Sequence, residues 1–425
     1  MDNSLRNQSF ITVLRNELIP ALGCTEPIAI AYVSAKARDV LGQFPDRMEI
    51  LCSGNIVKNV KGVMVPNAGG MRGVEIAAVL GVVGGNADRE LEVLHEVKSE
   101  HIAKAKKLIE EGFFSYTLAE GVANLYISAT VYSGEHFARV TVKNHHTYIT
   151  EIIKDGEYLY QSASAKTESE TDWSLWSIQG ILGFADEADL SQIQDVLERQ
   201  IELNTAISQE GLENPYGARV GRTLLDCCGE DVRTRAKAKA AAGSDARMGG
   251  CSMPVVINSG SGNQGMTVSL PVLEYAKEMN VSQEKLYRAL LVSNLVSIYQ
   301  KHYIGSLSAF CGAVTAACGS GAAITDLCGG DYDAVARTIT NTVANAGGIV
   351  CDGAKSSCAA KIASAVDAAI MAHHMSMEGR VFQPGEGIVK NDVEETIKSV
   401  GYMGRVGMAQ TDIEVLGLMM DRVTL

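Results

Sequence analysis

The sequence is poor in proline and contains no block of basic residues. Its 425 residues include only 8 prolines but 42 glycines, about 10% against the usual ~7%. This composition is typical of a compact chain in which backbone closely approaches other backbone or a ligand. The 37 basic and 50 acidic residues give a formal net charge of −13. An acidic chain without a basic patch is unsuited to bind nucleic acid or an anionic membrane surface.

The sequence also lacks a secretion signal and a convincing membrane span. The first residues, MDNSLRNQSF, contain no apolar core. Two long uncharged stretches, Met248–Leu273 and Tyr303–Thr325, are rich in small and polar residues, so we expect them to be buried in a globular protein. Ten cysteines are too dilute for a disulfide scaffold and favour a reducing cytoplasm, where grouped cysteines more often bind metal or take part in catalysis.

The length suggests two or three domains of roughly 150 residues each. Residues 1–170 mix helical and strand periodicities, which predicts a mixed α/β domain with an antiparallel sheet. The expected helices are Phe10–Leu18, Pro27–Leu41 and Ala87–Glu111, and the expected strands are Met48–Ser53, Ala123–Ser133, Phe137–Val142 and Tyr148–Ile153, with a turn at Gly134–Glu135.

Residues 171–425 show helical periodicity almost throughout, and the hydrophilic stretch 162–172 is the expected connection to them. The expected helices are Leu175–Phe184, Ser191–Ser208, Ala236–Ala242, Pro271–Met279, Gln283–Gln300, Asp331–Ala346 and Ser356–Met375. The sequence therefore predicts an α+β protein, with an N-terminal mixed α/β domain and a C-terminal mostly α-helical domain.

Four cysteines in the second half form two pairs with the same spacing. Cys311 and Cys318 make one C-x6-C pair, and Cys351 and Cys358 make another. Zinc sites usually show C-x2-4-C pairs, whereas iron–sulfur cubanes tolerate wider spacing. Cys351 is expected in a loop and Cys358 in the first turn of a helix, where unpaired N–H groups favour thiolates. On spacing alone, small buried thiols explain the pattern as well as a closed or open metal site does.

Another cysteine, Cys24, lies in the segment Gly23-Cys-Thr-Glu-Pro27, just before an apolar helix. Thr25 is the expected N-cap of that helix, and Pro27 suits its first turn. We expect the positive end of the helix to lower the pKa of the Cys24 thiol and to make it basic or nucleophilic near neutral pH. The alternative is a small packed residue beside a cap.

The glycine-rich segment Gly260-Ser-Gly-Asn-Gln-Gly265 matches G-x-G-x-x-G. Pro271 is expected to interrupt the following helix, and no βαβ unit is evident, which argues against a dinucleotide site. A better interpretation is a loop whose N–H groups, with the Asn263 and Gln264 amides, hold a small polar ligand, although a close-packed turn would look the same. The adjacent pair His145–His146 is expected on opposite faces of a strand, at the surface.

Several separated motifs resemble those of one enzyme family. They are GCTEP from residue 23, SGN-x3-NV-x2-VMVPN from residue 53, NPYG from residue 214, AAGSDARMGG-x7-NSGSGNQG from residue 241 and CDGAK-x2-CA from residue 351. Over nearly the whole chain the sequence resembles the L-cysteine desulfidase family, which is related to the iron–sulfur L-serine dehydratase alpha chain. The resemblance implies a lyase that cleaves L-cysteine by α,β-elimination to pyruvate, ammonia and hydrogen sulfide, without pyridoxal phosphate.

The resemblance also implies a cofactor and a set of site residues. Three cysteines, Cys311, Cys351 and Cys358, would hold an oxygen-sensitive [4Fe-4S] cluster with one open iron, which leaves Cys318 as a neighbour that is not a ligand. Cys24 matches the catalytic cysteine and would act as the base. The expected substrate-binding residues are Thr25, Glu26, Asn263 and Gln264. We expect a cytoplasmic homodimer that acts on a small amino acid and has no nucleic-acid or membrane partner.

The sequence departs from the serine dehydratases in several places. Their Ser-His-Thr-x-Gly-Pro element is replaced by the Gly23–Pro27 segment, the interval between the last two cluster cysteines is shorter, and the final residues 421–425 contain no cysteine for the fourth iron. These departures favour a thiol substrate. An iron–sulfur L-serine or L-threonine dehydratase and a non-enzymatic cluster-bearing amino-acid or redox sensor stay open as alternatives.

Overall fold

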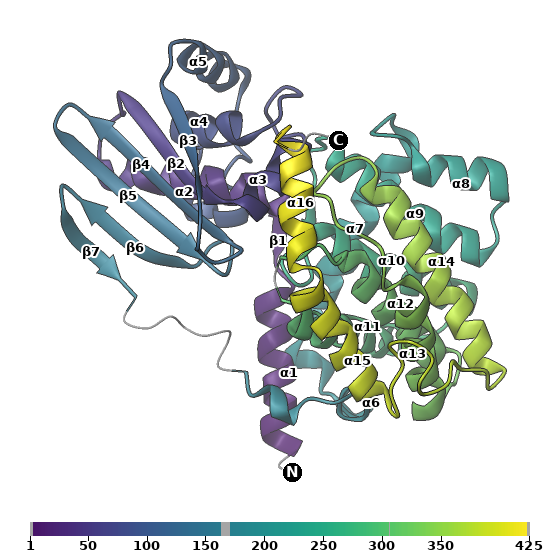
Figure 1. Ribbon diagram of the computed structural model, residues 1–425. Helices are drawn as coiled ribbons and strands as arrows, with labels where there is room; N and C mark the ends of the chain where they lie inside the picture. The colour runs from purple at the N-terminus through teal and green to yellow at the C-terminus, as the bar shows by residue number, and fades with distance from the viewer. Residues whose placement is uncertain (1–2, 163–170, 306, 423–425) are drawn as a thin grey trace.

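The computed structural model describes residues 3–162, 171–305 and 307–422. A six-stranded sheet with helices beside it adjoins a larger helical part (Figure 1). This arrangement confirms the predicted α+β class, with strands concentrated in the first part of the chain and helices in the second. The predicted connection at 162–172 falls largely on residues 163–170, which lie outside the described residues.

The sheet is mixed rather than wholly antiparallel. Its strands are β2 (Arg47–Ser53), β3 (Phe114–Ala119), β4 (Tyr126–Ser133), β5 (His136–Lys143), β6 (Ile149–Lys154) and β7 (Glu157–Gln161), in the order β3-β2-β4-β5-β6-β7. Neighbours are antiparallel, as predicted, except that β2 and β3 are parallel. A parallel pair needs a long crossover, which the helices between β2 and β3 supply. The turn at Gly134–Glu135 joins β4 and β5 as predicted.

The helices of this part are α2 (Thr25–Leu41), α3 (Gly54–Lys61), α4 (Val74–Gly84), the 3-10 helix η1 (Ala87–Glu92) and α5 (Ser99–Glu110). Helix α2 packs on β4, β5 and α4, and a Cβ at Gly81 would lie only 2.3 Å from Ala31 O. Glycine at this position therefore lets α2 and α4 approach closely. The single helix predicted over residues 87–111 is wrong in its first half, because Glu90 has a φ of 45° that an α-helix does not allow.

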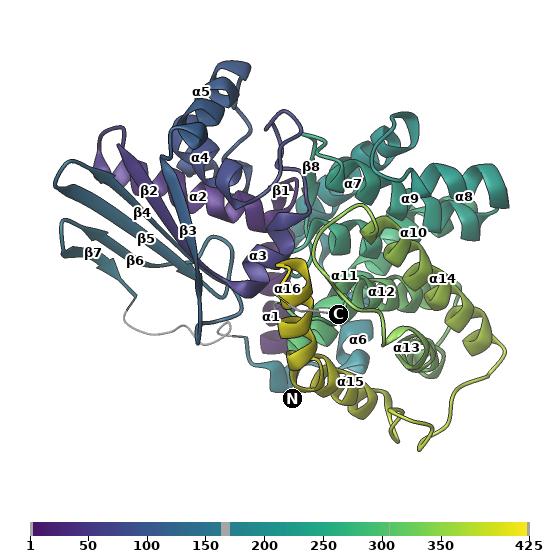
Figure 2. The same ribbon diagram turned by 45° about the horizontal axis from the view of Figure 1, so that its top comes forward.

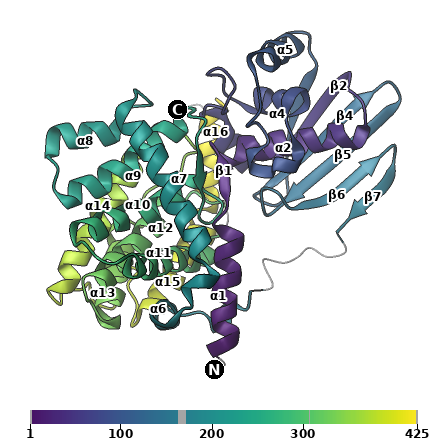
Figure 3. The ribbon, with the colours of Figure 1, turned by 180° about the vertical axis from the view of Figure 1, so that it is seen from behind.

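The helical part also takes in the N-terminus of the chain. Its elements are α1 (Asn3–Glu17), β1 (Pro20–Leu22), η2 (Trp173–Leu175), α6 (Ile178–Glu187), η3 (Leu190–Gln192), α7 (Gln194–Glu213), α8 (Val220–Cys228), α9 (Val232–Met248), β8 (Pro254–Val256), α10 (Gly262–Glu278), α11 (Gln283–Ile304), α12 (Gly312–Leu327), α13 (Tyr332–Ala346), α14 (Cys358–Met377), α15 (Val393–Tyr402), the π-helix η4 (Met403–Gly407) and α16 (Ala409–Met419). Strand β1 pairs antiparallel with β8, and Arg15 of α1 forms an ion pair with Asp195 of α7 at 2.9 Å. The chain therefore crosses between the two parts more than once, as Figures 2 and 3 also show.

Helix α12 lies in the interior of the helical part. It packs against α10, α11, α13 and α14, and residues 313–325 are all buried. This confirms the expectation that the uncharged stretch ending at Thr325 lies in a protein interior. Within the described ranges, no helix has both the length and the apolar character needed to cross a bilayer.

Helix α10 continues through Pro271, so the predicted interruption is wrong. Proline removes one backbone hydrogen bond from a helix and crowds the preceding turn. Residues 264–272 are all buried, and this tertiary packing outweighs the local cost of the proline.

A buried aspartate, Asp245, joins α9 to the start of α8. Its Oδ2 accepts a hydrogen bond from Gly221 N at 3.0 Å, while its Oδ1 is buried with no hydrogen-bond partner among the described residues. Burial raises the pKa of the Asp245 carboxyl from 3.8 to about 6. Because the folded protein binds this proton more tightly than the unfolded chain does, the carboxylate lowers stability increasingly between about pH 4 and pH 6.

We expect Asp245→Asn to raise the free energy of unfolding by up to about 3 kcal/mol at pH 7.5 and to have little effect near pH 4. Urea denaturation of the metal-free protein at the two pH values measures the difference. The exposed Asp226→Asn, which breaks an ion pair with Arg222 on α8, is the control and should show no such pH dependence. An equal effect of Asp245→Asn at both pH values would contradict the raised pKa of the Asp245 carboxyl.

Candidate active site

A cavity of about 380 Å³ lies between the two parts of the molecule, within the size range of small-molecule sites. It brings together most of the site residues that the sequence predicts. Those that line it are Cys24, Glu26, Asn263, Gln264, Cys311, Cys351 and Cys358. Thr25 does not line the cavity, and its hydroxyl group donates a hydrogen bond to Gly260 O at 2.9 Å. Thr25 therefore fixes the start of α2 against the glycine-rich loop.

The N-termini of α2, α10, α12 and α14 open onto this cavity. Cys24 is the N-cap of α2, Ser261 of α10 and Cys311 of α12, and Cys358 is the first residue of α14. Helix N-termini present unpaired N–H groups and the positive end of the helix dipole. The cavity is therefore electrostatically suited to hold anionic groups.

The loops before α12 and α14 pair with each other. Phe310 and Val350 form an isolated antiparallel bridge, and Cys351 N donates to Ala309 O at 2.6 Å. This pairing places Cys311 and Cys351 side by side, and Cys358 begins the helix that follows. The predicted positions of Cys351 in a loop and Cys358 in a first helical turn are confirmed.

The fourth cysteine of the two pairs, Cys318, lies elsewhere. It is in the middle of α12, fully buried, and its Sγ lies 3.8 Å from Ile339 O on α13. It does not line the cavity. The two C-x6-C pairs are therefore not equivalent, although they look alike in the sequence.

The cavity cysteines are surrounded by positive charge. Burial, together with the neighbouring Cys351 and Cys358, raises the pKa of the Cys311 thiol to about 12. Burial lowers the pKa of Lys301 on α11 to about 8. Besides the thiols, Asp412 opposes this lowering of the Lys301 pKa, and Asp412 is itself paired with Lys58.

In the part of the chain that the structure describes, no three His, Cys, Asp or Glu side chains converge closely enough to hold a single metal ion.

The environment of Cys24 differs from the prediction. The residue is the N-cap of α2, in place of the expected Thr25, and it is only 2% exposed. Its Sγ donates a hydrogen bond to Glu26 Oε2 at 3.0 Å. Burial and the negative charge of Glu26 raise the pKa of Cys24 well above its usual value, and the nearby Arg247 only partly opposes them. The expected lowering by the helix end is therefore wrong for the ligand-free protein.

Glu26 is a buried carboxylate held by several partners. Asn59 Nδ2 donates to its Oε1 at 3.0 Å, and His146 Nε2 lies 3.9 Å from the same oxygen. Burial alone would raise the pKa of Glu26, but the interactions with His146 and Cys24 lower it to about 2. Glu26 is therefore a permanent negative charge on the cavity wall.

His146 is a cavity residue that the sequence analysis misplaces. It lies in the loop between β5 and β6, not on a strand, and lines the cavity beside Glu26. The adjacent His145 also lines the cavity. The prediction extended the strand past the end of β5 into the loop. Nothing local in the sequence shows that the hairpin formed by β5 and β6 reaches the helical part.

Arg247, at the end of α9, is a second cavity residue not singled out from the sequence. It is 2% exposed, and its guanidinium group donates to Gly23 O at 2.8 Å and to Asn263 Oδ1 at 3.1 Å. A Cβ at Gly262 would lie 2.5 Å from Arg247 Nε, so glycine makes the room for this side chain. The glycine-rich segment thus makes room for an arginine on the cavity wall.

Comparisons with known proteins identify the family of the chain. The model of the family described as serine dehydratase alpha chain matches residues 88–417. A UPF0597 protein of Lachnoclostridium phytofermentans is 51% identical over 97% of this chain and 100% of its own length, and one of Desulfitobacterium hafniense is 48% identical over 98% and 97%. A UPF0597 protein of Finegoldia magna is 46% identical over 98% of this chain and 100% of its own length. The chain belongs to the serine dehydratase alpha chain family.

Proposed function

We propose that this chain is a lyase that cleaves L-cysteine by α,β-elimination to pyruvate, ammonia and hydrogen sulfide. In this proposal Cys311, Cys351 and Cys358 hold a [4Fe-4S] cluster and Cys24 is the base. The observation that supports it most directly is that these four cysteines line one cavity together with groups of both charges. Membership of a serine dehydratase family supports a lyase of this general type.

The residues of the cavity fit an anionic iron–sulfur cluster. Three thiolates on a cubane give it net negative charge, which the N-termini of α12 and α14 and the buried Lys301 would stabilise. Burial raises the pKa of the Cys311 thiol, and bound iron would supply the positive charge that favours its thiolate. When bound, a cluster with three cysteine ligands supplies an open iron that acts as a soft Lewis acid for a departing sulfur.

The charges of the cavity also fit the zwitterion of an amino acid. Arg247, Asn263 and the N–H groups at the start of α10 offer donors to a carboxylate. Glu26, which stays ionised, offers an acceptor to the α-ammonium group. Cys24 is hydrogen-bonded to Glu26 and lies within the electrostatic influence of Arg247, so it sits beside both ends of such a substrate. The proposal therefore assigns the Cα–H bond of the bound amino acid to Cys24.

The reaction requires a base and a leaving group. In its thiolate form, which burial and Glu26 disfavour and Arg247 favours, Cys24 removes the α proton. The Cβ–S bond breaks, and its electron pair leaves with the sulfur as hydrosulfide. The aminoacrylate that remains tautomerises and is hydrolysed to pyruvate and ammonia. A positioned base contributes ~10²–10⁴-fold to the rate, and Lewis-acid activation contributes several kcal/mol.

All ten cysteines are unpaired in the structure, which supports a reducing compartment such as the cytoplasm for this enzyme.

We expect Cys24→Ala and Cys24→Ser to lower kcat/KM for sulfide release by about 10²–10⁴-fold, because each removes the proposed base. Both variants should retain the iron content of the wild type under anaerobic purification. Cys227→Ser, at an exposed thiol near the end of α8, is the control and should leave activity unchanged. Wild-type rates in both Cys24 variants would remove this residue from catalysis.

The two C-x6-C pairs provide a matched test of the cluster ligands. Cys311→Ala should lose most of the bound iron after anaerobic reconstitution, since it removes a ligand. Cys318→Ala removes a buried thiol of the same helix that points away from the cavity, and it should retain its iron. Quantification of iron and acid-labile sulfide, with an absorption spectrum, measures both. Equal iron content in the two variants would refute the ligand assignment.

An iron–sulfur L-serine dehydratase is the competing function, favoured by the description of the matching family. Anaerobic pyruvate formation from L-cysteine and from L-serine, with the same preparation, separates the two functions. We expect kcat/KM to be higher for cysteine, because the open iron binds a thiolate more strongly than a hydroxyl group. A higher value for serine would replace the desulfidase proposal with the dehydratase.

A further inference from the structure

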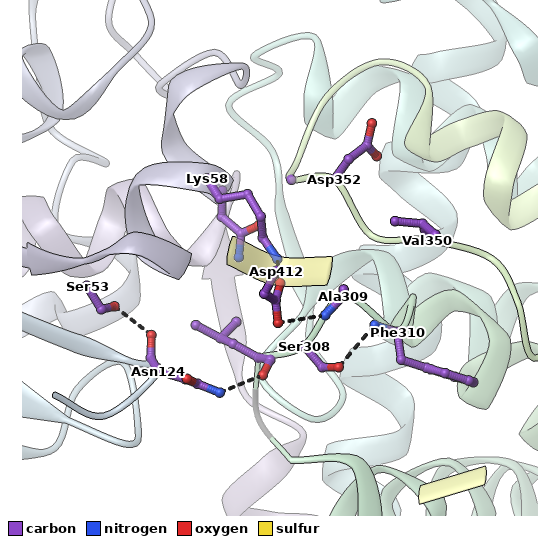
Figure 4. A network of polar contacts seen from close by, with 12 residues as sticks. Ser53, Lys58, Asn124, Ser308, Ala309, Phe310, Val350, Asp352 and Asp412 are labelled. Atoms are coloured by element: carbon purple, nitrogen blue, oxygen red, sulfur yellow. Dashed lines mark hydrogen bonds and ion pairs between the residues drawn. The ribbon is translucent and has the colours of Figure 1, made fainter. Parts of the chain in front are cut away.

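One lysine is linked to both of the loops that carry the cavity cysteines, to the first through Asp412 and to the second directly. Lys58 of α3 reaches across to α16, where its Nζ forms an ion pair with Asp412 (Figure 4). Asp412 Oδ2 in turn accepts a hydrogen bond from Ala309 N at 2.9 Å. Ala309 lies two residues before Cys311. The ion pair is therefore tied directly to the first cysteine loop.

The backbone of Lys58 contacts the second loop. Gly353 packs so closely that a Cβ there would lie 2.2 Å from Lys58 O, and its φ of 91° is one that favours glycine. Gly353 lies two residues after Cys351, whose N–H group is bonded to Ala309 O. Lys58 thus touches the first loop through its side-chain partner and the second loop through its own carbonyl.

Contacts other than the Lys58–Asp412 ion pair also hold α16 on α3. Lys61 Nζ also donates to the carbonyl oxygen of Met419, and Leu416 packs against Gly54 with no room for a Cβ. The Lys58 and Asp412 side chains are only 2% and 13% exposed. Desolvation makes a buried pair a poor source of stability compared with apolar packing. Its distinguishing feature is the directional bond to Ala309.

Other polar contacts hold the same loop from different sides. Ser308 Oγ donates to Gly404 O at 2.6 Å. Asn124, in the loop before β4 (Figure 4), donates from its Nδ2 to Leu307 O at 3.0 Å. These bonds anchor residues further from Cys311. The Asp412–Ala309 bond holds the residue that also accepts the Cys351 amide, so it supports the backbone pairing between the two cysteine loops.

We propose that Lys58 and Asp412 are positioning residues, which hold the Cys311 and Cys351 loops at the separation that a metal cluster requires. The inference deepens the proposed function and rests on it, because the cluster gives that separation its role. Partners that orient metal ligands from outside the coordination sphere typically contribute about 10–100-fold to metal affinity.

The test uses the full chain, reconstituted with iron and sulfide without oxygen. Lys58→Met and Asp412→Asn each break the pair, and Lys58→Met/Asp412→Leu replaces both charges with apolar groups that leave no buried ion unpaired. Lys61→Met, which removes the neighbouring exposed contact to α16, is the matched control. We measure iron release to a ferrous chelator and, in metal-free protein, hydrogen exchange of the Cys311 and Cys351 amides.

All three Lys58 and Asp412 variants should release iron about 10–100-fold faster than the wild type, with faster exchange of both amides. Lys61→Met should behave as the wild type does. A purely stabilising role predicts a different result, in which the double variant recovers wild-type iron release together with its melting temperature, and that result would overturn the proposal. Wild-type rates of iron release and of amide exchange in the single variants would also overturn the proposal. If the single variants do not fold, the iron release of the double variant decides between the positioning role and the purely stabilising role.

The same experiment separates the two proposals. If the wild-type chain takes up no iron, the proposed function fails, and amide exchange alone decides whether Lys58 and Asp412 position the loops. If the wild type holds iron and the variants release it at the wild-type rate, only the positioning role fails.

Discussion

Backbone pairing between the loops before α12 and α14 is the interaction on which the cavity depends. The Phe310–Val350 bridge is flanked by hydrogen bonds from Cys311 N to Ile349 O and from Cys351 N to Ala309 O. Backbone bonds fix the Cα positions of the two cysteines whatever their side chains do. Because α12 and α14 begin directly after these loops, the same pairing also directs both helix N-termini into one space.

Charge is separated across that space. The thiols of the helical part lie with Lys301 and two helix N-termini. Glu26 of α2 lies on the cavity wall with Asn59 and His146. Arg247 lies between, beside Cys24 and Asn263. A ligand with an anionic end, a cationic end and a soft donor matches all three regions at once. Neither part of the molecule carries the whole set, so the complete cavity wall depends on how the two parts are joined.

Much of this could be predicted from the sequence, and the failures have identifiable physical causes. The α+β class, most helices and the loop and helix positions of Cys351 and Cys358 follow from periodicity and caps. The pKa direction of Cys24 is wrong because desolvation and the Glu26 charge outweigh a helix end. Pro271 is tolerated because the surrounding turns are buried. His146, Arg247 and the Lys58–Asp412 pair are tertiary features, and no local pattern shows which distant residues they contact. The functional roles of Cys24 and of the three cavity cysteines stay predictions.

The position of Asp412 has a consequence for the order in which the molecule is completed. This residue belongs to α16, the last helix of the chain, yet it anchors the backbone just ahead of Cys311. Domains begin to fold on the ribosome from their N-terminal side. A nascent chain can therefore assemble the β-sheet and most of the helical part while the first cysteine loop still lacks its anchor. The cysteine loops of a nascent chain can therefore take their final arrangement only after α16 has been made.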